Sequence, residues 1–519
     1  MTWAELHGVL RRRGLIRGDD ALRAEAALGP VSHIAYDSRA VTRGDVFVAL
    51  KGQHADGTTF VRQAVERGAV AVVSEQPAPA DVHVPWTIVK DARVALAILA
   101  VTFYSNPSSE MRVVGITGTN GKTTTAYLVA SIFEAAGIPS GMLGTVTYRI
   151  GPGDNDVREA ARTTPEAPDV QALLREMIDR GCGACAMEVS SHALAQRRVD
   201  GTTFAAAVFT NLTRDHLDFH ADMEAYFEAK RRLFEMLPRD APSIINVDDP
   251  RGESLVAIGG RAVTYGLSAK ADVTPDALSF SLTGLTFDIR TPRGVLHVRS
   301  RLVGRPNVYN ILAAAATTTA LDLPFDAVER GIATLEGVPG RFEVVSGPKD
   351  EVTVVVDYAH TDDALRNLLE TARPLASGRL ITVFGCGGDR DRTKRPLMGA
   401  VAGRLSDLVV ITSDNPRSED PNRIIEEIRR GITPDTPRRA AAGAPGRSDD
   451  ARRSAQSVLA IPDRRAAIAK AIEVARSADL VLIAGKGHEK YQVIGDRTLP
   501  FDDAAVAREA LARRRTGVV

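Results

Sequence analysis

A glycine-rich segment at residues 115–125 carries the clearest chemistry in this sequence. It reads GITGTNGKTTT, follows an apolar run at 111–117 and precedes a helix-like stretch. A strand, a glycine loop and a helix N-terminus together bind phosphate, because backbone N–H groups and the positive end of the helix dipole point at the anion. Lys122 can then reach the terminal phosphates, and the Thr123 hydroxyl is placed to bind Mg²⁺. The segment predicts that the chain handles a nucleoside triphosphate.

The spacing of this loop differs from the strict pattern G-x-x-x-x-G-K-[ST]. Counting back from Gly121, the first glycine of that pattern falls on Ile116, whereas the glycines stand at Gly115 and Gly118. A chance glycine turn is the alternative explanation, but the flanking strand and helix favour phosphate binding. The variant spacing argues against a generic motor or a small GTPase.

Two later apolar runs end in polar residues that suit a metal or a nucleotide. The segment MEVSSHAL (187–194) places Glu188 at the end of a predicted strand, where a carboxylate beside a phosphate loop suits Mg²⁺ directly or through water. The next strand runs into NLTRDHLDFH (211–220), a loop in which a solvated turn and a nucleotide or metal site are both possible explanations. Its charged and imidazole residues are Arg214, Asp215, His216, Asp218 and His220.

A lysine stands on the apolar face of a helix predicted at 223–237. Lys230 falls on a stripe with i, i+3, i+4 spacing, while Arg231 and Arg232 turn away from it. The ordinary interpretation is a lysine whose stem packs on the stripe while its ammonium reaches water. The alternative is a lysine held close to the metal and phosphate site and modified to carry negative charge. The apolar residues of the stripe are Met223, Tyr226, Phe227, Phe234 and Leu237.

Three polar loops follow apolar strands in the last third of the chain. They are FGCGGDRDRTKRP (384–396), DNPR (414–417) and GKGHE (485–489). Each loop alone could be a helix cap or a surface turn. Together they should lie at the C-terminal edge of one parallel sheet, where open α/β folds bind ligands. Arginine forks bind a carboxylate and Glu489 can pair with an ammonium, so the cluster predicts a zwitterionic ligand.

The size and composition of the chain fit a multidomain enzyme. Its 519 residues suggest roughly three domains of about 150 residues each. The net charge is zero, so nothing indicates nucleic acid or an anionic membrane as a partner. No apolar run approaches the length of a transmembrane helix, and the N-terminus lacks the features of a signal peptide, so we expect the cytoplasm.

Alternating apolar runs and helical stretches indicate the elements that position these residues. β-Branched runs recur along the chain, which predicts an α/β protein with parallel sheets covered on both faces. Residues 283–298 differ, because Leu285, Phe287 and Ile289 alternate, turn through Thr-Pro-Arg-Gly and continue with apolar residues. This pattern predicts an antiparallel hairpin with one wet face.

Two segments predict the domain boundaries. SNPSSEM (105–111) and GVPGRFEVV (337–345) separate three parts, for which we expect bounds of 1–109, 110–339 and 340–519. The Pro-, Ala- and Arg-rich stretch 432–455 has little to bury and is interpreted as a flexible surface insertion.

The chain has three cysteines, of which Cys182 and Cys185 form a C-G-A-C motif. This motif could be a redox pair or half of a zinc site, but no second such pair or nearby histidine pair completes one. We expect these cysteines and Cys386 to be small buried packing residues.

The combination of these motifs closely resembles the Mur ligases, and within them the branch that adds the third peptide residue. The resemblance runs from 36–52 to 485–492, apart from the insertion at 432–455. It rests on GTNGKTT, TTPEAP, MEVSSHAL, NLTRDHLDFH, YFEAKRRLF, DYAHTDDAL, GCGGDRDRTKRP, DNPR and GKGHE.

The resemblance implies an ATP-dependent amide ligase of peptidoglycan precursor synthesis. Such an enzyme adds an amino acid to UDP-N-acetylmuramoyl-L-alanyl-D-glutamate after ATP has phosphorylated the D-glutamate γ-carboxylate. It implies a UDP-substrate-binding first domain, a central ATP-binding domain with a P-loop-type parallel sheet, and a Rossmann-like third domain that binds the amino acid. DNPR is the motif of family members that use meso-diaminopimelate rather than L-lysine. We also expect a monomer.

The resemblance also implies a role for individual residues of this chain. Catalysis would involve Lys122, Glu188, His216 and Lys230. Thr123 and Glu188 would hold one Mg²⁺, and His216 and N-carbamylated Lys230 would serve a second. ATP would be bound by Gly118, Thr119, Asn120, Gly121, Lys122, Thr123, Thr124, Asn307, Arg341, Asp357 and His360.

The two other substrates would have separate residue sets. The UDP-muramoyl-dipeptide would be bound by Ser38, Gln53, His54, Ala55, Thr163, Thr164, Ser190, Gln196 and Arg198. Diaminopimelate would be bound by Arg390, Asp414, Asn415, Pro416, Arg417, Gly485 and Glu489.

Two rival functions stay open on the sequence alone. Another ligase of the superfamily could add L-lysine, D-glutamate, a D-Ala-D-Ala dipeptide or a folate-linked glutamate, although DNPR and GKGHE argue against this. A phosphate-loop ATPase that acts as a switch would need no amino-acid pocket and would leave the third domain unexplained.

Overall fold

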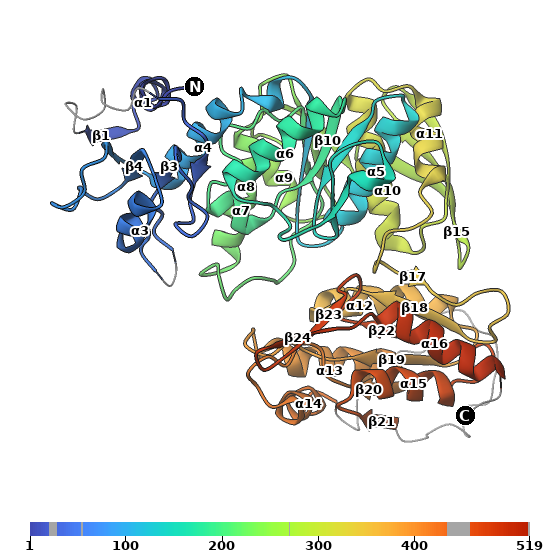
Figure 1. Ribbon diagram of the computed structural model, residues 1–519. Coiled ribbons are helices and arrows are strands. Elements are labelled where there is room, and N and C mark those ends of the chain that lie inside the picture. The colour runs from blue at the N-terminus through green and yellow to red at the C-terminus, as the bar shows by residue number, and fades with distance from the viewer. Residues whose placement is uncertain (20–28, 53–54, 269, 433–456, 517–519) are drawn as a thin grey trace.

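Three bodies, each built on its own sheet, follow one another along the chain in a computed structural model (Figure 1). The structure describes residues 1–19, 29–52, 55–268, 270–432 and 457–516. Apart from Ile432, the predicted insertion at 432–455 lies outside these residues. No helix in the described residues is long and apolar enough to cross a membrane. The domain boundaries at 109/110 and 339/340 stay predictions.

The N-terminal body contains a five-stranded sheet in the order β1-β5-β4-β3-β2. Strands β2 to β5 are parallel, and β1 pairs antiparallel with β5. The strands are β1 (Ile16–Asp19), β2 (Ile34–Ala35), β3 (Val46–Val48), β4 (Ala71–Ser74) and β5 (Trp86–Val89). The helices are α1 (Trp3–Arg12), α3 (Val61–Glu66) and α4 (Ala92–Phe103).

The middle body contains an eight-stranded sheet in the order β13-β12-β11-β6-β10-β7-β8-β9. Six of its strands are parallel: β6 (Arg112–Thr117), β7 (Ser140–Leu143), β10 (Ala184–Glu188), β11 (Ala206–Phe209), β12 (Pro242–Asn246) and β13 (Arg261–Tyr265). Antiparallel β8 (Thr147–Arg149) and β9 (Val157–Glu159) extend one edge. The helices are α5 (Lys122–Ala135), α6 (Ala167–Asp179), α7 (Ser191–Ala195), α8 (Met223–Glu235), α9 (Gly252–Leu255), α10 (Arg305–Ala320) and α11 (Phe325–Thr334).

The predicted hairpin is confirmed and belongs to a separate three-stranded sheet. Strands β14 (Thr274–Ser281), β15 (Gly284–Thr291) and β16 (Gly294–Ser300) run antiparallel, and Phe287 stands opposite Val298. Phe287 and Val298 are buried, whereas Thr286 and His297 on the other face are exposed. This is the half-buried alternation that the sequence predicts.

The C-terminal body contains a six-stranded sheet in the order β17-β18-β22-β19-β20-β21. Its strands are β17 (Glu343–Val344), β18 (Thr353–Asp357), β19 (Leu380–Phe384), β20 (Leu408–Ile411), β21 (Ser457–Ala460) and β22 (Leu480–Ala484), all parallel except β17. A small ribbon, β23 (Tyr491–Ile494) and β24 (Arg497–Pro500), lies beyond the sheet. The helices are α12 (Asp362–Ala372), α13 (Lys394–Leu405), α14 (Pro421–Arg429), α15 (Arg464–Val474) and α16 (Asp503–Thr516).

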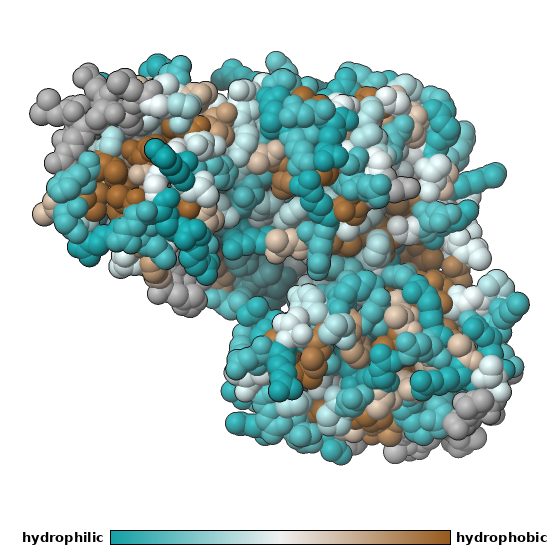
Figure 2. Space-filling model, in the orientation of Figure 1, coloured by the Kyte–Doolittle hydropathy of each residue, from teal (hydrophilic) through white to brown (hydrophobic). Residues whose placement is uncertain are grey.

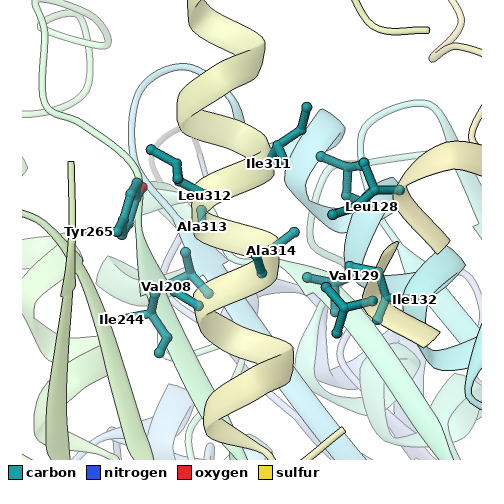
Figure 3. Close-up of a cluster of buried hydrophobic side chains, with 14 of the residues drawn as sticks. Leu128, Val129, Ile132, Val208, Ile244, Tyr265, Ile311, Leu312, Ala313 and Ala314 are labelled. Carbon is teal, nitrogen blue, oxygen red and sulfur yellow. The ribbon is translucent and has the colours of Figure 1, made fainter. Parts of the chain in front are cut away.

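Helix α10 shows how packing positions the central site. Its alanines 313–316 are fully buried between α5 and the sheet, where small side chains let the backbones approach closely (Figure 3). Leu128 and Ile132 of α5 lie on one side of the helix, and Val208 and Ile244 of β11 and β12 lie on the other. The second turn of α10 thereby reaches the glycine loop that precedes α5, as the contacts below show.

The three cysteines are free and buried, as the sequence predicts. Cys182 and Cys185 belong to the core beneath the middle sheet, where they fill space between apolar side chains. Burial raises the pKa of the Cys185 thiol, so this thiol stays protonated.

Candidate active site

The glycine loop connects β6 to α5 and lies between two neighbouring strand ends. The sheet order β11-β6-β10 places Thr117 beside Phe209 and Ile116 beside Glu188. The loops that follow these three parallel strands therefore meet at one sheet edge, as the sequence predicts. Helix α5 begins at Lys122, so its free N–H groups face the same edge.

Two glycines are required by the close approach of other side chains. Gly118 has a φ of +144°, and a Cβ there would lie 1.9 Å from Thr210 Oγ1. Gly121 has a φ of +88°, and a Cβ there would lie 2.4 Å from Asn310 Oδ1 of α10. Thr210 Oγ1 also donates to the Asn120 carbonyl over 2.6 Å, which ties the loop to the end of β11. The unusual glycine spacing thus has a steric reason in this fold.

Lys122 bends back over the loop that it follows. Its Nζ donates to the carbonyl oxygens of Gly118 and Thr119 over 2.9 and 2.8 Å. Burial lowers the pKa of Lys122, whereas the nearby charges of Glu188 and Asp215 act to raise it. An ammonium in this position faces any anion that binds at the N-terminus of α5.

Thr123 and Glu188 come together as the sequence predicts for a Mg²⁺ site. Thr123 Oγ1 donates to Glu188 Oε2 over 3.1 Å, and both side chains are buried. Thr145 holds the same carboxylate, because its N–H donates to Oε1 over 2.8 Å and its hydroxyl donates to Oε2 over 3.0 Å. The described residues contain no group of three or more His, Cys, Asp or Glu side chains able to hold a metal ion. One carboxylate and one hydroxyl fit Mg²⁺, which takes few protein ligands beside phosphate and water.

Lys230 is almost completely buried, with 1% of its surface exposed. Its Nζ donates to the Gly118 carbonyl over 2.9 Å and lies 4.3 Å from the centre of the Tyr226 ring. Burial and the charge of Lys122 hold the pKa of Lys230 well below its usual value. The interpretation as a lysine that reaches water is therefore wrong. The ammonium points at the phosphate loop instead.

The loop 211–220 closes over the same place. His216 has a φ of +54° and a ring 6.1 Å from the Tyr226 ring, so it and Lys230 share one aromatic neighbour. Burial lowers the pKa of His216 to about 4, which keeps the imidazole neutral and able to bind a metal. Asp215 Oδ2 lies 3.4 Å from His216 Nε2, and Asp215 Oδ1 accepts from the His216 backbone N–H over 2.8 Å. His220 instead contacts Ser191 Oγ over 2.9 Å.

Three of the predicted ATP residues come from the start of the C-terminal body. Arg341 Nη2 donates to Thr123 Oγ1 over 3.3 Å, and its guanidinium lies 4.7 Å from the Tyr358 ring centre. Asp357 accepts from the N–H groups of Phe342 and Ala359, and His360 Nδ1 contacts the Tyr358 carbonyl. Arg341 therefore joins the two bodies at the phosphate loop.

Asn307 lies in the first turn of α10, behind the glycine loop. Its Nδ2 donates to the Val303 carbonyl over 2.8 Å, and its Oδ1 accepts from Asn310 Nδ2 over 2.9 Å. Asn310 in turn packs against Gly121. The predicted adenine contact of Asn307 stays a prediction, and in this structure its amide orients Asn310.

The residues predicted for the UDP-muramoyl-dipeptide lie in two places. In the N-terminal body Ser38 donates to Gln63 Oε1 over 2.8 Å and Ala55 pairs with Gly52, while Gln53 and His54 lie outside the described residues. In the middle body Thr163, Thr164, Ser190, Gln196 and Arg198 are neighbours. Thr164 Oγ1 accepts from the Ser190 N–H, and the Thr164 carbonyl accepts from the Arg198 guanidinium. Arg198 also donates to Gln196 Oε1 over 2.5 Å, and the Thr163 hydroxyl contacts that of Thr145.

The three polar loops predicted to bind the amino acid, called the amino-acid loops below, follow β19, β20 and β22, which are neighbours in the C-terminal sheet. Arg417 Nη1 donates to the Gly388 carbonyl over 2.8 Å, which joins DNPR to the glycine turn after β19. Asn415 Nδ2 donates to Glu489 Oε2 over 3.0 Å, which joins DNPR to GKGHE. Asp414 and Pro416 flank Asn415 in the chain, and Gly485 begins the last loop with a φ of +118°. Arg390 Nη1 donates to the Asp389 carbonyl.

The structure adds residues that the sequence reasoning missed. Thr145 holds Glu188, Asn211 Oδ1 accepts from Asn120 N over 2.9 Å, and Lys486 lies at the centre of the amino-acid loops. Asn211 and Lys486 stand within the motifs NLTRDHLDFH and GKGHE, so their motifs were a usable signal. Thr145 has no such signal, because it stands outside these motifs.

The three bodies meet at a recess (Figure 2) and are joined by hydrogen bonds. Figure 2 shows a hollow where the upper bodies meet the C-terminal body below them. Contacts across this junction join Arg214 to Thr393 over 2.7 Å and Asn120 to Asp363 over 3.3 Å. Tyr36 and Asp169, 2.7 Å apart, join the N-terminal and middle bodies. The bodies therefore meet close to the predicted phosphate, sugar-peptide and amino-acid residues.

Three family models match this chain in order. They are the Mur ligase family catalytic domain at residues 30–104, the Mur ligase middle domain at 116–318 and the Mur ligase glutamate ligase domain at 340–487. A UDP-N-acetylmuramoyl-L-alanyl-D-glutamate--2,6-diaminopimelate ligase of Geobacter metallireducens is 50% identical over 91% of this chain and 93% of its own length. The ligase of the same name from Solibacter usitatus is 48% identical over 94% and 95%.

Solved structures show the same relationship. A structure of a UDP-N-acetylmuramoyl-L-alanyl-D-glutamate--2,6-diaminopimelate ligase is 33% identical, covers 99% of both chains and has a TM-score of 0.67. A MurF ligase from Thermotoga maritima in complex with ADP covers 94% of this chain and 98% of its own, with a TM-score of 0.62. At 19% identity, that second likeness shows the fold alone. With family models along all three bodies and relatives that match nearly end to end, this chain belongs to the Mur ligase family.

Proposed function

We propose that this protein is the ATP-dependent ligase that adds meso-diaminopimelate to the D-glutamate γ-carboxylate of UDP-N-acetylmuramoyl-L-alanyl-D-glutamate. The observation that carries the proposal is the shared identity of 43–50% with relatives of that name along more than nine-tenths of the chain. The amino-acid loops support it, because Arg417 and Glu489 offer one cation and one anion to the amino-carboxylate end of the substrate. We expect a monomer that acts in the cytoplasm.

The reaction requires activation of a poor electrophile. A γ-carboxylate oxygen attacks the γ-phosphorus of ATP, ADP leaves, and an acyl phosphate forms. The amine of the amino acid then attacks the acyl carbon, a tetrahedral intermediate forms, and inorganic phosphate leaves as the amine loses a proton. Phosphoryl transfer and phosphate departure place negative charge on phosphoryl oxygens, and attack of the amine places it on the acyl oxygen, so cationic side chains lower these barriers.

The residues around the glycine loop suit these demands. The N–H groups at the start of α5, Lys122 and Arg341 surround the place where phosphate would bind. Thr123 and Glu188 would hold Mg²⁺, whose charge would offset that of the phosphates. Lys230, if N-carbamylated, would bring a carboxylate to this place beside the neutral imidazole of His216.

One assay separates this function from its rivals. Phosphate release from ATP is measured with the UDP-muramoyl-dipeptide and an amino acid, each alone and both together, with diaminopimelate beside L-lysine. We expect release only with both substrates and a strong preference for diaminopimelate. Release without an amino acid would indicate an ATPase switch, and equal use of L-lysine would indicate the wrong amino acid.

A further inference from the structure

Lys486 is a fully buried cation at the centre of the amino-acid loops, with 0% of its surface exposed. Its Nζ donates to Asp414 Oδ1 over 3.2 Å, to Asn415 Oδ1 over 2.9 Å and to Glu489 Oε2 over 3.1 Å. An ammonium has three N–H donors, so all of them are used within the protein. Lys486 therefore has none left for a substrate and differs in this from Arg417.

The contacts of Lys486 determine the orientation of Asn415. Asn415 Oδ1 also accepts from the Val493 N–H over 2.9 Å, so both of its lone pairs are occupied. The carboxamide nitrogen must then point to the other side, where it donates to Glu489 Oε2 over 3.0 Å. Without the ammonium, the amide could rotate and exchange its donor and acceptor.

The same contacts leave one oxygen of Glu489 available. Oε2 accepts from both Lys486 and Asn415, whereas Oε1 has no hydrogen-bond partner in the described part of the chain. Arg417 is similar, because only its Nη1 is bonded, to the carbonyls of Gly388 and Asn415, among the described residues. One anionic and one cationic group are thus held by their inner atoms and offer their outer atoms.

The charges of the pocket also balance around Lys486. Burial alone would raise the pKa of Asp414, but the charges of Lys486 and Arg464 outweigh it and lower that pKa. Asp414 and Glu489 are both within 3.2 Å of the ammonium, which places one cation between two carboxylates. Together with Arg417, they form a set of zero net charge that suits a zwitterion.

A second buried pair supports the same two loops from below. Arg464 and Asp503, both 0% exposed, are 2.7 Å apart, and Asp503 begins α16. The Arg464 guanidinium donates to the Ser413 carbonyl over 3.3 Å and to the Ala484 carbonyl over 3.0 Å. These carbonyls directly precede DNPR and GKGHE, so the pair holds together the two loops that Lys486 joins.

We propose that Lys486 is a positioning residue of the amino-acid pocket, which holds Asn415 and Glu489 so that the free Glu489 oxygen meets the ammonium of the amino-carboxylate end of the incoming amino acid. This inference rests on the proposed function for the identity of that amino acid. Lys486 touches no substrate in this assignment and acts through Glu489 and Asn415. Its removal should therefore weaken amino-acid binding selectively.

The test compares Lys486→Met with wild type in the full-length protein, by phosphate release with all three substrates. We expect the KM for diaminopimelate to rise at least about 10-fold, while the KM values for ATP and the UDP-muramoyl-dipeptide stay within about 2-fold. Lys490→Met is the matched control, because Lys490 is an exposed lysine at the end of the same loop and pairs with Asp502. Its three KM values should match those of wild type. An unchanged KM for diaminopimelate in Lys486→Met, or equal losses for all three substrates, would overturn the proposal.

A double variant distinguishes positioning from a structural role. If Lys486 acts through Glu489, Lys486→Met should raise the KM little further in a Glu489→Gln background, whereas independent effects would multiply and contradict the proposal. Should Lys486→Met fail to fold, Lys486→Gln, which keeps two donors, is judged by the same selective KM change. Phosphate release by the wild-type protein with each amino acid is measured first and tests the proposed function separately. If the protein uses another amino acid, the KM ratios are measured with that substrate.

Discussion

Lys230 shows how a buried polar group can reveal chemistry at the scale of one residue. Its amine lies at the phosphate loop with a carbonyl and an aromatic ring as neighbours, and no described carboxylate forms an ion pair with it. Burial of an unpaired ammonium is costly, so an amine that becomes a carbamate after reaction with CO₂ would suit a place next to the proposed Mg²⁺ site better. The assignment has two consequences, loss of activity and rescue.

We expect Lys230→Ala to be nearly inactive and to regain activity when short-chain carboxylates such as acetate are added. The added carboxylate would fill the space of the side chain and supply the missing charge. Phosphate release with all substrates, with and without acetate, measures both effects. Arg231→Ala is the control, because among the described residues Arg231 pairs with Glu228 and Glu235 alone, at the surface. Full activity of Lys230→Ala without rescue would remove the metal role.

Arg417 should decide the affinity for the distal carboxylate of diaminopimelate. We expect Arg417→Ala to raise the KM for diaminopimelate by at least about 10-fold, or about 1.4 kcal/mol, because a charge-assisted bidentate contact is lost. The measurement is phosphate release against amino-acid concentration. Arg429→Ala, which removes an exposed arginine from α14, should leave the KM for diaminopimelate unchanged. An unchanged KM in Arg417→Ala would refute this assignment.

At the scale of elements, parallel strand ends bring distant motifs together. Strands β10, β6 and β11 deliver Glu188, the glycine loop and the 211–220 loop to one edge, and β22, β19 and β20 deliver the three amino-acid loops to another. The loops are then shaped by contacts that a larger side chain would block. Gly118 is the clearest case, since Thr210 fills the space beside it.

We expect Gly118→Ala to lower the affinity for ATP by at least about 10-fold and to lower the unfolding temperature. A Cβ would lie 1.9 Å from Thr210 Oγ1, and Thr210 cannot rotate without losing its bond to Asn120. Calorimetric titration and thermal unfolding measure the two effects. Gly137→Ala is the matched control, because Gly137 has a φ of +76° but a Cβ there would meet no atom within 4 Å. This substitution should cost only about 1 kcal/mol of folding free energy and leave ATP binding intact. Equal ATP affinities of the two variants would contradict the steric argument.

The ion pair between Arg395 of α13 and Glu419, which lies just before α14, predicts that the stability of the fold depends on pH. Hydrogen bonds from the buried Arg395 lower the pKa of Glu419 from 4.5 to about 2. A carboxyl group with a lower pKa in the folded state stabilises the fold above the unfolded pKa, and this contribution disappears as the pH falls toward the folded pKa. The contribution should therefore be complete above pH 4.5 and lost near pH 2.

Glu419→Gln should lower the unfolding temperature at pH 7, by an amount equivalent to about 1–3 kcal/mol. The difference from wild type should shrink as the pH falls from 4.5 to 2. Thermal unfolding across this range measures it. Glu426→Gln, at an exposed position of the same helix region, should show no such difference. A difference between Glu419→Gln and wild type that is constant with pH would refute the assignment.

At the scale of the whole molecule, the proposed sites are divided among three bodies. Hydrogen bonds such as Arg341 to Thr123, at 3.3 Å, connect the middle and C-terminal bodies. Chemistry between ATP, a sugar-linked carboxylate and an amine needs the reacting atoms within about 3–3.5 Å of one another. We therefore expect the bodies to close around the substrates.

We expect the radius of gyration to fall when a non-hydrolysable ATP analogue and the UDP-muramoyl-dipeptide bind together. Small-angle X-ray scattering of the protein with each ligand and with both measures this change. UDP alone is the control and should have a smaller effect, because it cannot join the middle and C-terminal bodies. An unchanged radius of gyration at saturation with both ligands would contradict closure.

Local signals in the sequence were sufficient for the strand-loop-helix units, the hairpin at 283–298 and the neighbourhood of the three amino-acid loops. Each follows from short-range periodicity and from the rule that ligands lie at the carboxyl ends of parallel strands. The same periodicity placed Lys230 on the apolar face of α8. It could not tell whether that lysine reached water or the phosphate loop.

Tertiary structure alone decided which atoms meet across long separations. Thr145 reaches Glu188 across 43 residues, Lys486 reaches Asn415 across 71, and Arg341 reaches Thr123 across 218. Such contacts depend on strand order and on the junction between bodies, and neither leaves a local periodicity in the chain. The sequence by itself therefore determined the motifs and their sheet edges, whereas packing determined that Lys230 faces the glycine loop and that Lys486 lies between Asn415 and Glu489.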